Sequence, residues 1–216
     1  GEKPTTLHNN CSGKHCGFLA VGAVRGLDTV GYADASHPIM REVTNAISLM
    51  TGAELVESQA CVDGCAIPAF SMPLVSVAAG FARLGTGDGL SPSLACSAER
   101  IRSAIVQNPI MLSGEGRVDT CITAECHGEV FVKSGAEGVM AASIPALGYG
   151  LAVKIDDGAQ RAATAVMANL LLQVLQKHSL ATTKAKSVLE GHARFRLKNW
   201  NGADVGSVEP VSLAGS

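Results

Sequence analysis

The pattern of apolar and polar positions predicts four helices in the first half of the chain. Each carries apolar side chains over part of its surface, as expected for a helix that buries one face. The first has Asn10 or Ser12 as its expected N-cap, and the last carries Pro92 in its first turn. Residues 57–69 contain glycine and proline and predict a loop. The predicted helices span residues 13–23, 39–50, 73–84 and 91–107.

The pattern changes in the second half, where short β-rich runs are separated by glycine or proline. Their lengths favour antiparallel strands joined by tight turns. A long helix is predicted over 159–177, and the tail 193–210 predicts two short strands around Asn201-Gly202, a hairpin signal. Helices followed by strands indicate the α+β class. The three predicted strand runs are 128–135, 138–145 and 149–156.

Size and composition narrow the class of protein further. The chain has 216 residues, which we interpret as a single domain over 1–216 with a sizeable core. A net charge of −2 excludes the basic footprint of a nucleic-acid-binding protein, and no apolar run is long enough to span a membrane. The first residues contain no apolar core of a signal peptide.

The seven cysteines show no compact disulfide framework, and their number is odd. We therefore expect mostly free thiols in a reducing, cytoplasmic compartment. Cys96 is expected to be a small buried hydrophobe.

The stretch HNNCSGKHCGF, residues 8–18, concentrates reactive side chains at the start of the first predicted helix. Its Gly13-Lys14 pair suggests a phosphate-binding P-loop. That motif requires Gly at position 8 and Ser or Thr at position 15, but both positions are histidine. A P-loop is therefore excluded.

A metal site is a second interpretation of the same stretch. Cys11, His15 and Cys16 lie within two predicted helical turns, while Cys61 and Cys65 lie on the predicted loop. Thiolate and imidazole groups together suit zinc. The spacings match no standard zinc finger, so from spacing alone buried structural thiols remain the simpler alternative.

A nucleophile is a third interpretation, because Ser12 lies near Lys14 and Cys11 near His15. Ser-Lys chemistry usually places the lysine one helical turn after the serine. The 216 residues contain no Ser-x-x-Lys sequence, which argues against Ser12 as the nucleophile.

Three basic residues further along are also candidates. Arg117, in the predicted loop 113–120, can hold a carboxylate through two hydrogen bonds or form an ordinary surface ion pair. Lys133 and Lys154 lie within predicted strands, where lysine usually faces solvent. An inward-facing lysine would be desolvated and available as a base.

Six motifs, in order from about residue 8 to residue 210, resemble the L-asparaginase II family of the Rhizobium etli type. The resemblance implies a fold akin to serine β-lactamases and glutaminases, with an antiparallel sheet flanked by helices. It implies a helical part with the zinc site over about 8–127 and a strand-rich part over about 128–216. The motifs are NNCSGKHCGFLA, VDGCAIPAF, SGEGRVDT, VKSGAEGV, GLAVKIDDG and LKNWNGADVGSV.

The same resemblance implies hydrolysis of L-asparagine to L-aspartate and ammonia through a serine acyl-enzyme, by a homodimer. It assigns zinc to Cys11, Lys14 and Cys65, with Lys14 as a neutral amine ligand made possible by the ion's charge. Lys133 corresponds to the family lysine that pairs with a catalytic serine. Beside the ion or the substrate the resemblance places Ser12, His15, Asp63 and Arg117.

One departure from the family pattern concerns the nucleophile. The family carries a Ser-x-x-Lys motif and a second catalytic serine upstream of the first motif found here. We therefore expect an N-terminally incomplete chain, either a fragment or a truncation. Two alternatives to catalysis remain open, which are a non-catalytic zinc-binding remnant and a structural module that completes another chain's active site.

Overall fold

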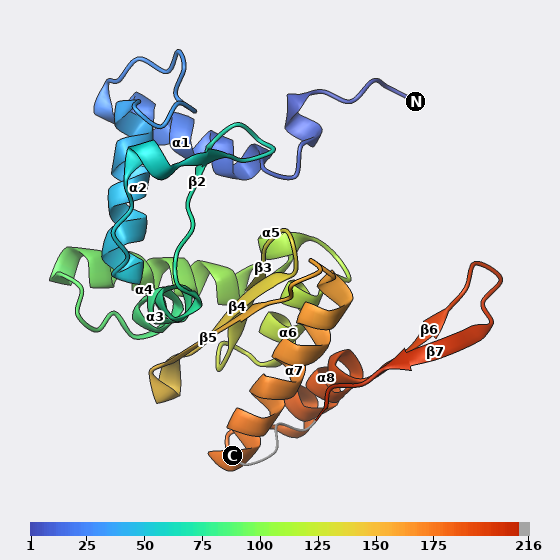
Figure 1. Cartoon of the computed structure of the whole chain (residues 1–216). Helices are drawn as coiled ribbons and strands as arrows, with labels where there is room; N and C mark the ends of the chain where they lie inside the picture. Colours follow the sequence, from blue (N-terminus) through green and yellow to red (C-terminus); the bar gives the residue numbers. More distant parts are fainter. Residues whose placement is uncertain (212–216) are drawn as a thin grey trace. The chain divides into compact units, whose positions relative to one another are not determined.

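The computed structural model describes residues 1–211, and their contacts divide the chain into two compact units (Figure 1). The first is Gly1–Pro73 and the second is Leu74–Ser216. Helices and short antiparallel strands occur in both, which confirms the α+β class. The interpretation of 1–216 as one domain stays a prediction. Among the described residues, every helix is too short or too polar to traverse a lipid bilayer.

The first unit contains two helices and a small hairpin. Helices α1 (Ser12–Arg25) and α2 (Pro38–Thr51) confirm the first two predicted helices. The predicted loop 57–69 instead contains a 3-10 turn η2 (Glu57–Gln59) and the antiparallel pair β1 (Cys61–Val62) and β2 (Pro68–Ala69). A further 3-10 turn, η1 (Thr6–His8), precedes α1.

The predicted N-cap of α1 is wrong by one residue, because Cys11 occupies that position. The side chain of Asn9 accepts a hydrogen bond from the Cys11 backbone N–H at 2.8 Å. This bond turns the chain one residue before Ser12, which is already helical. The Cys11 side chain makes no capping bond and is free for other contacts.

The second unit is built around a three-stranded antiparallel meander, as the sequence predicts. Strands β3 (Phe131–Ser134), β4 (Val139–Ile144) and β5 (Tyr149–Lys154) pair in that order. Strand β4 is central and buried along nearly its whole length.

Helices cover both faces of this sheet, as the resemblance implies. Helix α3 (Leu74–Thr86) packs on β4 and β5, with the Phe81 ring 6.1 Å from the Phe131 ring. On the other face, α6 (Val118–Glu125) and α7 (Gln160–Lys177) enclose the main apolar core. Alternate β4 residues serve the two faces, because side chains of a strand point to opposite sides in turn. The largest buried core side chains here include Ile122, Met140, Ile144, Met167, Leu171 and Leu175.

Helix α4 (Pro92–Gln107) confirms the fourth predicted helix, but three helices of this unit were not predicted. They are α5 (Ile110–Ser113), α6 and α8 (Thr183–Ala193). Helix α6 overlaps the predicted loop 113–120, of which only the glycine-rich half is irregular. Helix α8 buries Ala185, Leu189 and Ala193.

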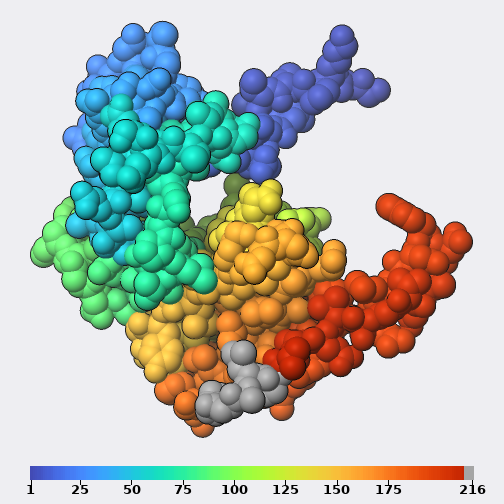
Figure 2. Space-filling model, in the orientation of Figure 1, coloured from blue at the N-terminus to red at the C-terminus, as the bar shows by residue number. Residues whose placement is uncertain are grey.

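The tail forms the predicted hairpin, in which β6 (Phe195–Lys198) pairs with β7 (Asp204–Val208). It projects from the rest of the second unit (Figures 1 and 2), and Trp200 at its turn is fully exposed.

All seven cysteines are free thiols, as predicted. The prediction that Cys96 is buried is wrong, because Cys96 is exposed whereas Cys126 is 1% exposed. Helix α4 buries Ala98, and a residue two positions away lies on nearly the opposite side of a helix.

Candidate metal and catalytic residues

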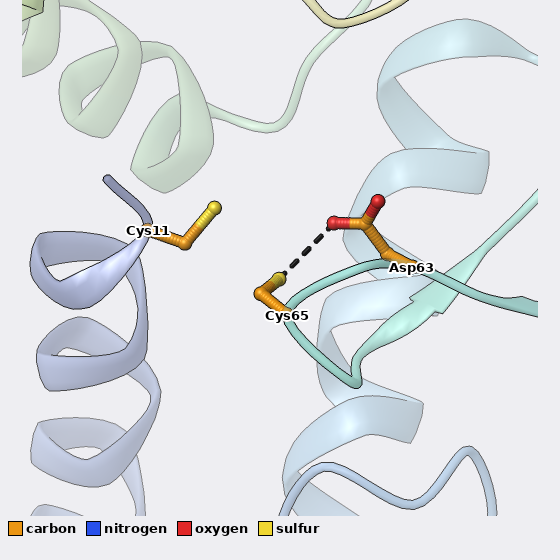
Figure 3. A group of neighbouring side chains, drawn as sticks. All are labelled: Cys11, Asp63 and Cys65. Carbon is orange, nitrogen blue, oxygen red and sulfur yellow. Dashed lines mark hydrogen bonds between the residues drawn. The ribbon is translucent and has the colours of Figure 1, made fainter. Parts of the chain in front are cut away.

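The first unit brings Cys11, Asp63 and Cys65 together (Figure 3). Their thiol sulfurs and one carboxylate oxygen all lie within 4.8 Å of one another. Cys11 is the N-cap of α1, whereas Asp63 and Cys65 lie on the turn between β1 and β2. The group therefore joins two segments that are about fifty residues apart in the sequence.

Backbone hydrogen bonds hold the β1–β2 turn in shape. The Asp63 N–H donates to the Ile67 carbonyl at 2.9 Å, and the Ala66 N–H donates to the Asp63 carbonyl at 2.8 Å. Ala66 has a φ of +75°, a left-handed conformation that side chains other than glycine rarely adopt. The Cys65 thiol then donates to Oδ2 of Asp63 at 3.1 Å.

The charges of this group favour a protonated thiol beside an ionised carboxylate. Burial raises the pKa of Cys65, and its hydrogen bond to Asp63 raises it further. The same hydrogen bond lowers the pKa of Asp63, to which the positive charge of Lys14 also contributes. Binding of a metal ion would therefore release the thiol proton.

The donor set fits a zinc ion. Two cysteine sulfurs with a third ligand close to them form a ligand set that zinc binds. The resemblance gives that third ligand as Lys14, whereas the group of close donors contains Asp63. The charge of Lys14 acts on both Asp63 and Cys65. Cys16 and Cys61 are exposed and lie outside this group.

A pocket of about 730 Å³ in the same unit includes Ser12, His15, Tyr32 and Cys65 among its lining residues. The His15 Nδ1 lies 2.5 Å from the Tyr32 hydroxyl, and the two rings meet edge to face. Among the described residues, the buried Nε2 of His15 has no hydrogen-bond partner. Tyr32 was not predicted, because it lies in an irregular segment 17 positions after His15.

The second unit contains a separate cluster around Lys133. Its Nζ donates to Oγ of Ser113 at 3.3 Å, to Oδ2 of Asp119 at 3.1 Å and to the Ser134 carbonyl at 2.8 Å. The Lys133 side chain is 45% exposed, whereas that of Asp119 is 1% exposed. Lys133 thus lies at the surface with its ammonium group turned onto a buried carboxylate.

Burial alone would raise the pKa of Asp119, but three partners outweigh it. Hydrogen bonds from Ser113 and Ser134 and the charge of Lys133 lower the pKa below its usual value. Asp119 is therefore an ionised carboxylate in the protein interior. Its other oxygen, Oδ1, has no hydrogen-bond partner among the described residues.

Asp119, Ser113 and Ser134 were not predicted from the sequence. A usable signal existed for Asp119, because this acid is followed by the apolar Ile122 at helical spacing. Arg117, which was predicted, is exposed at the N-cap of α6. Lys154 is exposed, and its ammonium group donates to the Ile155 carbonyl.

Comparisons with known proteins point to one family. A search of curated proteins finds no match. The family model described as L-asparaginase II matches residues 1–210, which is nearly the whole chain. That match covers both the cysteine group of the first unit and the Lys133 cluster of the second. The chain therefore belongs to the L-asparaginase II family.

Proposed function

We propose that this protein hydrolyses the side-chain amide of L-asparagine to L-aspartate and ammonia. The match to the L-asparaginase II family over residues 1–210 carries the proposal. Family membership implies a small-molecule amide as the substrate. The family resemblance also suggests a homodimer, and the free thiols suggest a reducing, cytoplasmic setting.

The proposed route is an acyl-enzyme formed, by the family resemblance, on the serine of a Ser-x-x-Lys motif, which these 216 residues do not contain. The serine oxygen attacks the amide carbonyl, ammonia leaves with a transferred proton, and water then hydrolyses the ester. Lys133 is our candidate for the residue that moves these protons. Its contact with the Ser113 hydroxyl, at 3.3 Å, supports this role because it brings the amine within reach of a serine oxygen. Arg117 is a candidate for holding the substrate carboxylate.

We assign the metal site to Cys11, Lys14 and Cys65, with Asp63 beside it. A bound zinc ion would supply positive charge that orients or polarises the substrate. Cys11 lies at the start of α1, Cys65 and Asp63 lie on the β1–β2 turn, and Cys65 also lines the pocket. Ser12 and His15 line the same pocket and are our candidates for substrate contact.

Ammonia release from L-asparagine tests the proposal directly. We expect the protein to release ammonia and the Lys133→Ala variant to lose nearly all of this activity. Lys154→Ala is the matched control, because Lys154 is also an exposed strand lysine but bonds only to a backbone carbonyl among the contacts described above. Absence of ammonia release by the unaltered protein would contradict the proposal and favour a non-catalytic metal-binding role.

A further inference from the structure

The Oδ2 atom of Asp119 is the centre of the Lys133 cluster. It accepts hydrogen bonds from Ser113 Oγ at 2.6 Å, from the Ser134 N–H at 3.0 Å and from Ser134 Oγ at 2.8 Å. It also accepts the bond from Lys133 Nζ. One oxygen thereby connects the end of α5, the first turn of α6 and the end of β3.

Asp119 is buried among fixed partners, whereas the Lys133 side chain is half exposed. Helix α6 buries Ile122 and Thr123 in the core, and Thr123 Oγ1 accepts a bond from the Val132 N–H on β3 at 3.4 Å. Asp119 therefore has a fixed position relative to the strand that carries Lys133. A lysine side chain has four rotatable bonds and, when half exposed, populates many rotamers unless its end is held.

We propose that Asp119 is a positioning residue that holds the Lys133 ammonium group against the Ser113 hydroxyl. This inference rests on the proposed function only in that Lys133 is taken as the proton-transfer group. Asp119 acts through Lys133 and need not touch the substrate. The two serine hydroxyls keep the carboxylate ionised and aligned, so that its charge remains directed at the lysine.

Competitive acylation tests this assignment without needing enzyme activity. The folded protein is treated briefly with a limiting amine-acylating reagent at fixed pH, digested, and the acylation of each lysine measured by mass spectrometry. The Lys133 nitrogen is engaged by Asp119, Ser113 and the Ser134 carbonyl, and it must leave these partners before it can attack the reagent, so it reacts slowly. We expect Lys133 to be acylated several-fold more slowly than Lys154, although both are exposed. Equal rates in the unaltered protein would overturn the proposal.

Asp119→Asn keeps the shape of the side chain and removes its charge. We expect the ratio of Lys133 to Lys154 acylation to rise roughly fivefold, the factor that corresponds to loss of one partly buried ion pair. Ser134→Ala is the control, because Asp119 Oδ2 loses one hydrogen bond but keeps the Ser113 hydroxyl, the Ser134 N–H and Lys133 as partners, so the ratio should change little. An unchanged ratio in Asp119→Asn would contradict the assignment.

Loss of folding gives a different result, because all lysines would then become reactive together and the ratio would approach one. Circular dichroism identifies an unfolded variant. The acylation rates of Lys133 and Lys154 in the unaltered protein then decide whether Asp119 holds Lys133. Failure of asparagine hydrolysis with the expected acylation pattern would reject the proposed function but retain the role of Asp119. Asparagine hydrolysis together with equal acylation rates of Lys133 and Lys154 would support the proposed function and reject the role of Asp119.

Discussion

Gly150 lies directly against the backbone of Ala78. A Cβ atom built on Gly150 would lie 1.8 Å from the Ala78 carbonyl oxygen and 2.7 Å from the Ala82 nitrogen. Both obstacles are backbone atoms of α3, which a side-chain rotation cannot move. Strand β5 approaches α3 this closely because position 150 has no side chain.

Gly150→Ala should therefore push α3 away from the sheet and destabilise the second unit by about 3 kcal/mol. Urea unfolding followed by circular dichroism measures the change. Gly191→Ala is the matched control, because its Cβ would meet nothing within 4 Å and it lies in helix α8. There we expect a gain of about 0.5–1 kcal/mol from helix propensity. Equal stabilities of the two variants would refute the close-packing argument.

Metal content should depend on the two clustered cysteines. Elemental analysis of the purified protein should give about one zinc ion per chain, as expected for a single site of this type. The Cys11→Ser, Cys65→Ser double variant should lose it. Cys96→Ser is the control, because Cys96 is exposed on α4 and lies outside the group of close donors. Retention of zinc by the double variant would reject these ligands.

Single variants of the two neighbours would identify the third ligand. Lys14→Met and Asp63→Leu each remove one candidate donor while keeping a similar side-chain size. If Lys14 binds the ion, its replacement should lower the zinc content more than replacement of Asp63. The reverse order would make Asp63 the ligand, in line with its place among the close donors.

Stability should also depend on pH through His192. Burial lowers the pKa of His192 below its usual value of 6.5. Below pH 6.5 the unfolded chain therefore binds a proton that the folded protein resists, so stability falls as pH decreases through and below this value. His192→Gln should reduce this slope, and above pH 7.5 the two proteins should show parallel curves. Chemical unfolding at several pH values measures both, and identical slopes below pH 6.5 would contradict the expectation.

Elements with strong periodicity or turn signals could be predicted from the sequence. The antiparallel meander and the hairpin around Asn201-Gly202 are clear cases, because their strands are short, β-rich and bounded by turn residues. Helix α8 was missed because alanine supplies most of its buried face, and alanine alone gives little periodic signal. Helix α6 was hidden by the glycines that precede it and by Asp119 on its buried side.

The residues of the candidate site also differ in how far the sequence could predict them. Cys11 and Cys65 were proposed from the resemblance, and no sequence pattern shows that a turn with Ala66 in a left-handed conformation would bring them together. The Lys133 cluster depends on three segments meeting at one buried oxygen. Such a meeting is a tertiary property, since no spacing between residues 113, 119 and 133 encodes it.

The rate at which a reagent labels the buried thiol of Cys126 can measure local opening of the second unit. Burial, followed by the negative charges of Glu129 and Glu125, raises the pKa of this thiol to about 12. At neutral pH a thiol reagent therefore meets neither an accessible sulfur nor a thiolate while the unit is closed. Its slow labelling, after the exposed cysteines have reacted, reports how often the core around α6 opens.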